Sequence, residues 1–224
     1  MNPVIVLGGT FDPPHHGHLA LLQAAGNALA MVDRRFLIAA DPWQKTGVTP
    51  AKHRVAMLEL AVGALDTQDS RVGAQRLSID TRELARHATT GEPSYTIDSL
   101  RELRAELGAH TTLTFVLGWD QWLALPSWHE WRSLLDVAHL CVAPRVQAFG
   151  SVSAELEEWS RFKFASAHAL REAPAGLVFQ LPQFEQAVSS SDLRAALGGA
   201  QAGDVDLWLE PAVLRYIAEN RLYR

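Results

Sequence analysis

The sequence predicts an α/β fold, a doubly wound parallel sheet with a small C-terminal helical part. Two continuous apolar runs, Val4–Leu7 and Phe36–Ala40, are predicted to be buried strands. The stretch between them, Leu19–Met31, has helical character. A strand, a loop, a helix and a second strand in this order call for a right-handed crossover and a parallel sheet. Further alternation of helices and strands along the chain extends the pattern.

The alternation continues through the middle of the chain. Residues 50–65 look helical, and Arg76–Ile79 is a short strand candidate. Apolar residues then recur at helical spacing from Ile97 to Leu107, with Asp98 in the first turn, where the helix dipole favours an acidic residue. Three further strands are expected, at Leu113–Leu117, Ala138–Val142 and Leu177–Leu181.

Helices dominate the end of the chain. Residues 151–175 have charged helical character and no recognisable site. A last helix is predicted to begin at Pro211, which suits the first helical position, and to bury an apolar stripe from Val213 to Ile217. Because no repeat or low-complexity tract divides the sequence, we expect one domain over residues 1–224, with a C-terminal helical portion at about 188–224.

The composition is that of a globular protein with a modest negative charge. Hydrophobic residues make up 48% and charged residues 20% of the 224 positions, which excludes a disordered, collagen-like or coiled-coil chain. A net charge of −5 argues against a nucleic-acid binder, although a local pocket can still be positive. The single cysteine, Cys141, allows neither an intrachain disulfide nor a cysteine zinc site. With no apparent signal peptide or membrane span, we expect a cytoplasmic protein with small-molecule partners, no nucleic acid and no membrane.

The loop between the first strand and the first helix carries the strongest functional signal. It runs from Gly8 to His18 as Gly-Gly-Thr-Phe-Asp-Pro-Pro-His-His-Gly-His. Ligands of doubly wound folds bind beyond the carboxyl ends of the strands, which is where this loop is expected. Gly8 and Gly9 would let the backbone turn sharply and approach a ligand. Pro14 disfavours helical geometry at Pro13, so the helix is expected to begin no earlier than Pro14. Three histidines near a helix N-terminus therefore suggest polyphosphate binding.

Other interpretations of this loop are weaker. It lacks the Gly-Lys-Ser/Thr ending of a Walker A loop, and it is not a Gly-x-Gly-x-x-Gly dinucleotide fingerprint. A zinc site built on His15 and His18 would need a third and a fourth ligand that the sequence does not offer nearby, so no protein-held metal is predicted. A polar loop with incidental histidines remains as the plain alternative.

A second candidate phosphate segment lies at the start of the C-terminal portion. It runs from Val188 to Arg194 as Val-Ser-Ser-Ser-Asp-Leu-Arg. Serine caps helices well, and hydroxyls with free N–H groups at a helix start bind phosphate oxygens. Arg194 lies one turn further on and can add a fork of donors. Taken alone, the segment would be explained equally well by an ordinary capped surface helix.

The two segments resemble the signature motifs of the nucleotidyltransferase superfamily. The pattern Gly9-x-Phe11-x-Pro13-x-His15-x-Gly17-His18 resembles the signature built on a His/Thr-x-Gly-His core, and the serine segment resembles Ile-Ser-Ser-Thr-x-Ile-Arg. This resemblance implies that the two motif histidines contact the ATP phosphates and stabilise charge that develops during transfer. It implies catalytic roles for His15, His18 and Arg194. The implied ATP-binding residues are Gly8, Gly9, Thr10, Phe11, His15, His18, Ser190, Ser191 and Arg194.

Four further segments resemble bacterial nicotinate-nucleotide adenylyltransferases. Pro42–Lys45 is similar to their proline-containing loop with a basic residue, and Pro93–Leu100 is similar to their Pro-Ser-Tyr-Thr-x-x-Thr-Leu stretch. Gly118-Trp-Asp, followed by Trp128-His-Glu-Trp, resembles their Gly-x-Asp and Trp-x-x-Trp pair. The tail from Pro211 resembles their Pro-x-x-Val-x-x-Tyr-Ile ending. The resemblance covers almost the whole chain and is weakest over residues 146–174.

The resemblance also implies a site for the acceptor nucleotide, and the chemistry of the tryptophan side chains supports it. An indole stacks well on a flat nicotinate ring, so we expect Trp128 to face the ligand and Trp131 to lie in the core. Packing of both in the core remains open, because tryptophans three apart share a helix face. In this family, backbone N–H groups near Thr96 and Trp128 hold the carboxylate. The implied acceptor-binding residues are Lys45, Thr96, Gly118, Asp120, Trp128 and Arg145.

Some of these assignments have plain alternatives. Asp120 could be a helix cap, and Lys45 and Arg145 could be solvated surface residues. The implied reaction joins nicotinate mononucleotide to ATP and gives nicotinate adenine dinucleotide and pyrophosphate, with Mg²⁺ bound mainly through the ATP phosphates. The alternatives are an adenylyltransferase for nicotinamide mononucleotide or another phosphorylated acceptor, and a non-catalytic nucleotide-sensing module. The remaining histidines, including His16 and His53, are expected to be structural or solvated.

Overall fold

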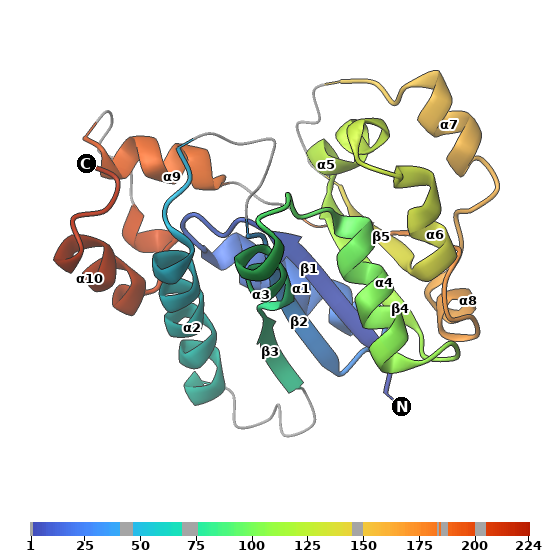
Figure 1. Ribbon diagram of the computed structural model, residues 1–224, viewed down its shortest axis with the longest axis horizontal. Helices are drawn as coiled ribbons and strands as arrows, with labels where there is room; N and C mark the ends of the chain where they lie inside the picture. Colours follow the sequence, from blue (N-terminus) through green and yellow to red (C-terminus); the bar gives the residue numbers. More distant parts are fainter. Residues whose placement is uncertain are drawn as a thin grey trace.

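The centre of the fold is a sheet of parallel strands that lies between layers of helices (Figure 1). A computed structural model describes residues 2–40, 47–68, 76–144, 150–182, 184, 188–199 and 205–224. Within these ranges the sheet has six strands in the order β3-β2-β1-β4-β5-β6. Their bounds are β1 Val4–Gly9, β2 Asp33–Ile38, β3 Arg76–Asp80, β4 Leu113–Gly118, β5 His139–Ala143 and β6 Val178–Gln180.

The chain enters this sheet in its middle. β1 pairs in parallel with β2 on one side and with β4 on the other, and the remaining neighbours are parallel as well. The direction in which the chain builds the sheet therefore reverses between β1 and β4. Such a switch point is where doubly wound folds bind ligands, beyond the carboxyl ends of the strands. The predicted doubly wound parallel sheet is confirmed.

Helices on the two faces of the sheet form two apolar cores. The helices are α1 His16–Ala28, α2 Ala51–Gln68, α3 Arg82–Thr90, α4 Thr96–Leu107, α5 Trp119–Ala124, α6 Leu134–Val137, α7 Ala154–Ser160, α8 Ala167–Arg171, α9 Ser190–Leu197 and α10 Pro211–Glu219. Side chains of α1, α2, α9 and α10 pack with strand residues such as Ile5 and Phe36. Those of α4 to α7 pack with strand residues such as Val4 and Leu37. Figure 1 shows α2, α9 and α10 at the left and α5, α6 and α7 at the right.

The strand predictions are confirmed, with the largest difference at the start of the second strand. β2 begins at Asp33, three residues before the predicted start at Phe36. Charged residues fit there because Arg34 turns its guanidinium onto the end of α1. It donates to the Met31 carbonyl at 3.0 Å and to Asn27 Oδ1 at 2.7 Å. A strand start built from charged residues gives no apolar signal in the sequence.

The helix α3 was not predicted, although it borders the functional site. Its contacts with α4 are polar: Arg82 pairs with Glu106 at 2.8 Å, and Arg86 pairs with Glu102 at 2.6 Å. The segment is short and mostly polar, with Leu84 as its one large apolar residue, so it offers little of the apolar signal that marks a helix in the sequence. The other predicted helices are present, and α1 begins at His16, within the limit set by Pro14.

Trp128 and Trp131 do not lie on one helix, which removes the alternative that both pack in the core from a shared helix face. Trp128 ends a short 3-10 turn, η1 (Leu125–Ser127), and Trp131 begins another, η2 (Trp131–Ser133). Glu130 separates them in the left-handed conformation, with φ of 46°. Trp131 is 5% exposed and packs edge-on against another indole, as expected for a core residue.

Among the described residues, no helix combines the length and the apolar character that a membrane span requires.

Candidate active site

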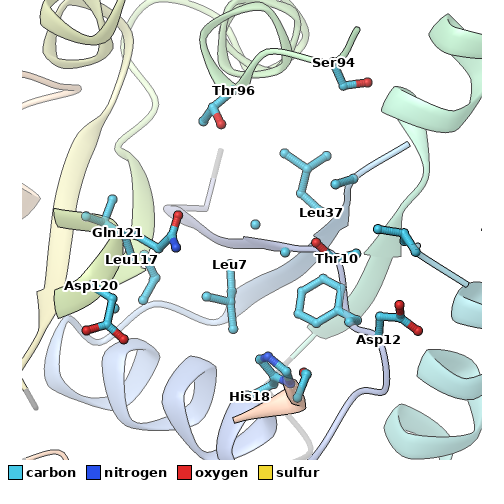
Figure 2. Close-up of a pocket in the computed structure, with 18 of the residues that line it drawn as sticks. Leu7, Thr10, Asp12, His18, Leu37, Ser94, Thr96, Leu117, Asp120 and Gln121 are labelled. Carbon is cyan, nitrogen blue, oxygen red and sulfur yellow. The ribbon is translucent and has the colours of Figure 1, made fainter. Parts of the chain in front are cut away.

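A cavity of about 520 Å³ opens at the carboxyl ends of β1 and β4, at the switch point of the sheet (Figure 2). Its volume is in the range of small-molecule sites. Figure 2 shows His18 on one side of the cavity and Thr96 across from it, with Asp120 and Gln121 on a third side. The side chains therefore converge from the two ends of the chain and from its middle.

Two stacked imidazoles form one wall of this cavity, at the start of α1. His15 is the N-cap residue of the helix, and its ring centroid lies 3.7 Å from that of His18. The backbone N–H of His15 donates to Nδ1 of His18 at 3.2 Å. Because Nδ1 accepts this bond, the proton of a neutral His18 ring belongs on Nε2. Phe11 packs edge-on against the same ring at 5.1 Å and fixes its orientation.

The His15 ring is buried, and the described residues provide no hydrogen-bond partner for its two nitrogens. Its residue is 1% exposed, and neither ring nitrogen has a hydrogen-bond partner within the described part of the chain. Burial, with a smaller contribution from His16, lowers the pKa of His15 from 6.5 to about 4. The ring is therefore neutral near pH 7 and offers one N–H donor to a ligand in the cavity.

The lowered pKa of His15 predicts a specific loss of stability in acid. The folded state binds the proton less well than the unfolded state, so the contribution is intact above pH 6.5 and is lost as pH falls toward 4. Between pH 7 and pH 5 this amounts to about 2 kcal/mol. His15→Gln should therefore lose about 2 kcal/mol less free energy of unfolding over that interval than the wild type, measured by urea denaturation. Identical pH dependence in both proteins would contradict the assignment.

The two glycines predicted to begin this loop serve packing rather than a turn. Both lie inside β1, and neither has a positive φ, so the predicted sharp turn at Gly8 and Gly9 is wrong. The positive φ belongs to Phe11, at 51°. A Cβ on Gly8 would lie 2.6 Å from the Phe115 ring, and one on Gly9 would lie 2.9 Å from the Phe11 ring. Glycine is needed here because aromatic rings occupy the space of a side chain.

The start of α9 forms the adjoining wall and touches the first loop. Ser189 is the helix cap, since its Oγ accepts from the backbone N–H of Asp192 at 3.2 Å. Ser190 Oγ instead donates to the Pro13 carbonyl at 3.0 Å, which joins α9 to the histidine loop. Because Ser189 is the cap, Ser190 and Ser191 lie in the first helical turn, and both line the cavity.

Arg194 also bridges the two predicted motifs. Its Nη1 donates to the Asp12 carbonyl at 2.6 Å, and its Nη2 lies 3.2 Å from Ser191 Oγ. The guanidinium lines the cavity while it holds the loop that carries the histidines. The residues that gather in this part of the cavity are His15, His18, Ser190, Ser191 and Arg194. We call it the phosphate end, after the ligand that the sequence predicts for them.

A buried arginine lies beneath this end of the cavity. Arg54 is 1% exposed and comes from α2. Its guanidinium donates to the carbonyls of Thr10 at 3.0 Å, Ala39 at 2.7 Å, Ala40 at 2.9 Å and Thr49 at 2.8 Å. These carbonyls follow the ends of β1 and β2 and precede α2. One side chain thus satisfies the backbone groups that two parallel strands leave at their carboxyl ends.

The other predicted residues line the far part of the cavity, which we name the acceptor end: Thr96, Gly118, Asp120 and Trp128. Asp120 is not the helix cap, because Gly118 holds the N-cap position of α5. Trp128 packs edge-on against Phe115 at 6.3 Å, and its indole Nε1 has no hydrogen-bond partner within the described residues. Thr96 begins α4 and faces the cavity (Figure 2).

Several predictions can be compared with the structure only in part. Lys45 and Arg145, together with the loop around Trp43, lie outside the described residues. Of the histidines expected to be structural, His16 contacts Glu210 and the Leu207 carbonyl, and His53 contacts the hydroxyl of a tyrosine on α10. The remaining predicted residues line one cavity: Gly8, Gly9, Thr10, Phe11, His15, His18, Thr96, Gly118, Asp120, Trp128, Ser190, Ser191 and Arg194.

Sequence reasoning missed Glu83, which lines the cavity from the unpredicted helix α3. It is 5% exposed and accepts a hydrogen bond from Ser99 Oγ at 2.7 Å. Burial raises its pKa, against the opposing effects of Ser99 and the nearby Arg86. The residue joins α3 to α4 beside the acceptor end. Its only sequence signal was an acidic residue in the first turn after a strand, which is common on helix surfaces.

The described residues contain no group of three or more His, Cys, Asp or Glu side chains placed to hold a metal ion. The carboxylates that line the cavity come singly from different elements. Asp12 follows β1, Glu83 lies on α3, and Asp120 lies on α5. Beside these carboxylates the cavity holds the guanidinium of Arg194 and the imidazoles of His15 and His18, which are donors that suit anionic ligands.

Comparisons with known proteins agree with this geometry. A family model of cytidylyltransferase-like proteins matches residues 6–196. The chain is 41% identical over 232 residues to a probable nicotinate-nucleotide adenylyltransferase of Stenotrophomonas maltophilia, covering 100% of this chain and 98% of that protein. It is 36% identical over 220 residues to the protein of the same name from Pseudomonas aeruginosa strain UCBPP-PA14, covering 98% and 96%.

Solved structures share the fold. The Plasmodium falciparum nicotinic acid mononucleotide adenylyltransferase complexed with NaAD superposes with a TM-score of 0.72 at 20% identity, over 100% of this chain and 98% of that one. A putative nicotinate-nucleotide adenylyltransferase from Vibrio parahaemolyticus gives a TM-score of 0.63 at 14% identity, over 100% and 96%. Together with the curated relatives that match nearly end to end, these findings show that the chain belongs to the nicotinate-nucleotide adenylyltransferases of the cytidylyltransferase-like family.

Proposed function

We infer that the protein transfers AMP from ATP to nicotinate mononucleotide, forming nicotinate adenine dinucleotide and pyrophosphate in NAD biosynthesis. The observation that supports this most strongly is the make-up of one cavity. Its phosphate end gathers neutral or cationic donors at two helix starts, and its acceptor end offers an indole and the start of a third helix. Such a cavity suits two anionic nucleotides that meet between these ends.

The phosphate end would hold the triphosphate of ATP. His15 has unpartnered ring nitrogens in a buried position, and a neutral His18 ring carries its proton on Nε2, as a donor, because Nδ1 accepts from the backbone. Ser191 adds its hydroxyl, both Ser190 and Ser191 add first-turn N–H groups, and Arg194 adds a charged fork. Fixed donors of this kind stabilise charge that develops on phosphate oxygens without reorganisation during the reaction.

The acceptor end would hold the pyridine nucleotide. The indole of Trp128 offers a flat apolar face for the nicotinate ring. Backbone N–H groups at the start of α4, near Thr96, suit the nicotinate carboxylate because a helix N-terminus attracts anions. Lys45 and Arg145 are proposed as further residues that bind the acceptor.

The chemistry needs positioning more than proton transfer. The acceptor phosphate is already ionised near neutral pH, so its oxygen can attack the α-phosphorus of ATP directly. The new bond joins this oxygen to the α-phosphorus, and the bond to the bridging oxygen breaks in line, so that pyrophosphate leaves with the electron pair. No covalent enzyme intermediate is required, and the protein contributes alignment and charge stabilisation.

Magnesium is proposed as a partner of the substrate rather than a resident of the protein. Mg²⁺ prefers oxygen ligands in octahedral geometry and usually keeps several waters beside substrate phosphates. The cavity carboxylates fit that mode, because Asp12 and Glu83 are already engaged by protein donors. When bound, the ion would neutralise charge on the leaving pyrophosphate.

The role of the acceptor end predicts a selective binding defect. Trp128→Ala should raise KM for nicotinate mononucleotide about tenfold, the loss expected from about 1.4 kcal/mol of ring stacking, while KM for ATP stays within about twofold. Trp159→Ala is the matched control, because this half-buried indole packs against Trp131 and does not line the cavity. Steady-state kinetics with each substrate varied in turn provide the measurement. If acceptor KM per folded molecule is unchanged in Trp128→Ala, this indole serves only packing.

A further inference from the structure

The second-to-last residue of the chain reaches the loop that follows the first strand. The hydroxyl of Tyr223 donates to Oδ1 of Asp12 at 2.5 Å, a contact that joins positions 211 residues apart. The tyrosine ring is half-buried and packs against the core shared by α1, α2, α9 and α10. Figure 1 shows the C-terminus close to α10 and to α9, the helix that carries the C-terminal part of the site.

Asp12 is held from three directions. Besides Tyr223, the backbone N–H of Thr49 donates to its Oδ2 at 3.0 Å. Arg194 donates to its backbone carbonyl at 2.6 Å. The residue is 3% exposed and lines the cavity, so these bonds take the place of water around a carboxylate that accepts only. Its position is therefore set by the C-terminus, by the segment before α2, and by α9.

This anchoring bears directly on the phosphate end of the cavity. Asp12 precedes His15 by three residues, and the intervening Pro13 carbonyl receives the hydroxyl of Ser190. A shift at Asp12 would move the stacked histidines and the start of α9 together. Burial and the hydrogen bond to Asp12 raise the pKa of Tyr223, so the hydroxyl remains a donor through the range in which an enzyme is assayed.

We propose that Tyr223 is a positioning residue for the reaction, acting through Asp12 to set the loop that carries His15 and His18. The inference rests on the proposed function, because it assigns the histidines to ATP. The tyrosine itself does not line the cavity, so its effect would pass through the hydrogen bond to the Asp12 carboxylate. A displacement of a fraction of an ångström in such a site is enough to lower turnover.

Tyr223→Phe tests this directly, because it deletes the hydroxyl and keeps the ring. Tyr216→Phe is the matched control: its hydroxyl lies 2.9 Å from Nδ1 of His53, and it also joins the C-terminal part to α2, but neither residue lines the cavity. We expect Tyr223→Phe to lower kcat about tenfold and to raise the Kd for ATP several-fold, with KM for the acceptor nearly unchanged. Tyr216→Phe should leave all three within about twofold.

The measurements are steady-state kinetics with Mg²⁺, calorimetric titration of ATP, and thermal melting of the three proteins. The calorimetry keeps the test valid if wild-type protein proves to act on another acceptor, a result that would count against the proposed function alone. Wild-type kcat and ATP affinity in Tyr223→Phe would overturn the positioning role. Equal losses of kcat and ATP affinity in both variants, in proportion to their lowered melting temperatures, would also overturn it. That pattern would mean that each hydroxyl only stabilises the fold.

Discussion

His18→Ala is expected to lower kcat about 10²- to 10³-fold while the protein stays folded. The side chain lies at the start of α1, and its Nδ1 accepts from the His15 backbone N–H, so a neutral ring carries on Nε2 the proton that it would donate to a phosphate oxygen. Removing a fixed donor at the reacting phosphate costs transition-state stabilisation that water does not restore. Steady-state kcat and thermal melting of the purified variant supply the measurement.

His16→Ala separates this role from a general effect of changing the loop. His16 lies between His15 and Gly17, at a variable position of the motif, but it contacts Glu210 and the Leu207 carbonyl and does not line the cavity. Its variant should keep kcat within a few-fold of the wild type and show a modest loss of stability at most. Near-normal kcat in His18→Ala, or equal losses in both variants, would remove His18 from the catalytic machinery.

Arg54→Met is expected to destabilise the fold by about 3 kcal/mol or more. Methionine keeps much of the apolar stem but leaves four carbonyls, those of Thr10, Ala39, Ala40 and Thr49, without the guanidinium. Buried acceptors that lose their donor each carry a desolvation cost. The same carbonyls frame the ends of β1 and β2, so ATP affinity should fall as well. Urea denaturation and calorimetric titration of ATP measure the two effects.

Arg34→Met provides the comparison for this experiment. Arg34 is also buried, at 3% exposed, and it also donates to backbone carbonyls, but at the end of α1 away from the cavity. Its loss should lower the free energy of unfolding by about 2 kcal/mol and leave ATP affinity unchanged. If Arg54→Met is as stable as the wild type, or binds ATP equally well when folded, the buried arginine does not support the site.

The sequence was sufficient for the parts of the fold whose signals are local. Strands such as Val4–Leu7 are continuous apolar runs, and the histidine loop and the serine segment are motifs that can be recognised without a structure. Their meeting in one cavity follows from the rule that parallel strands place their carboxyl ends at one edge. The right-handed crossover rule leaves the order of the strands open, so the switch point between β1 and β4 is known only from the structure.

The remaining features depend on contacts between distant residues, which periodicity cannot show. Tyr223 looks like the end of an apolar tail until its hydroxyl is found on Asp12. Arg54 looks like a surface residue of a helix, yet the ends of two strands bury it. The helix α3 is short and mostly polar and contacts α4 through ion pairs, so it gives less apolar signal than the helices that were identified from the sequence. The packing role of Gly8 likewise required the position of the Phe115 ring.

The most direct test of the central claim is pyrophosphate release by the wild-type protein with ATP and Mg²⁺, measured against a panel of acceptors. The panel contains nicotinate mononucleotide, nicotinamide mononucleotide and phosphopantetheine. If the cavity joins two anionic nucleotides between the histidine pair and Trp128, kcat/KM should be highest with nicotinate mononucleotide, and the dinucleotide should form. Preference for the amide would contradict the assigned acceptor, and no release with any acceptor would contradict the adenylyltransferase itself.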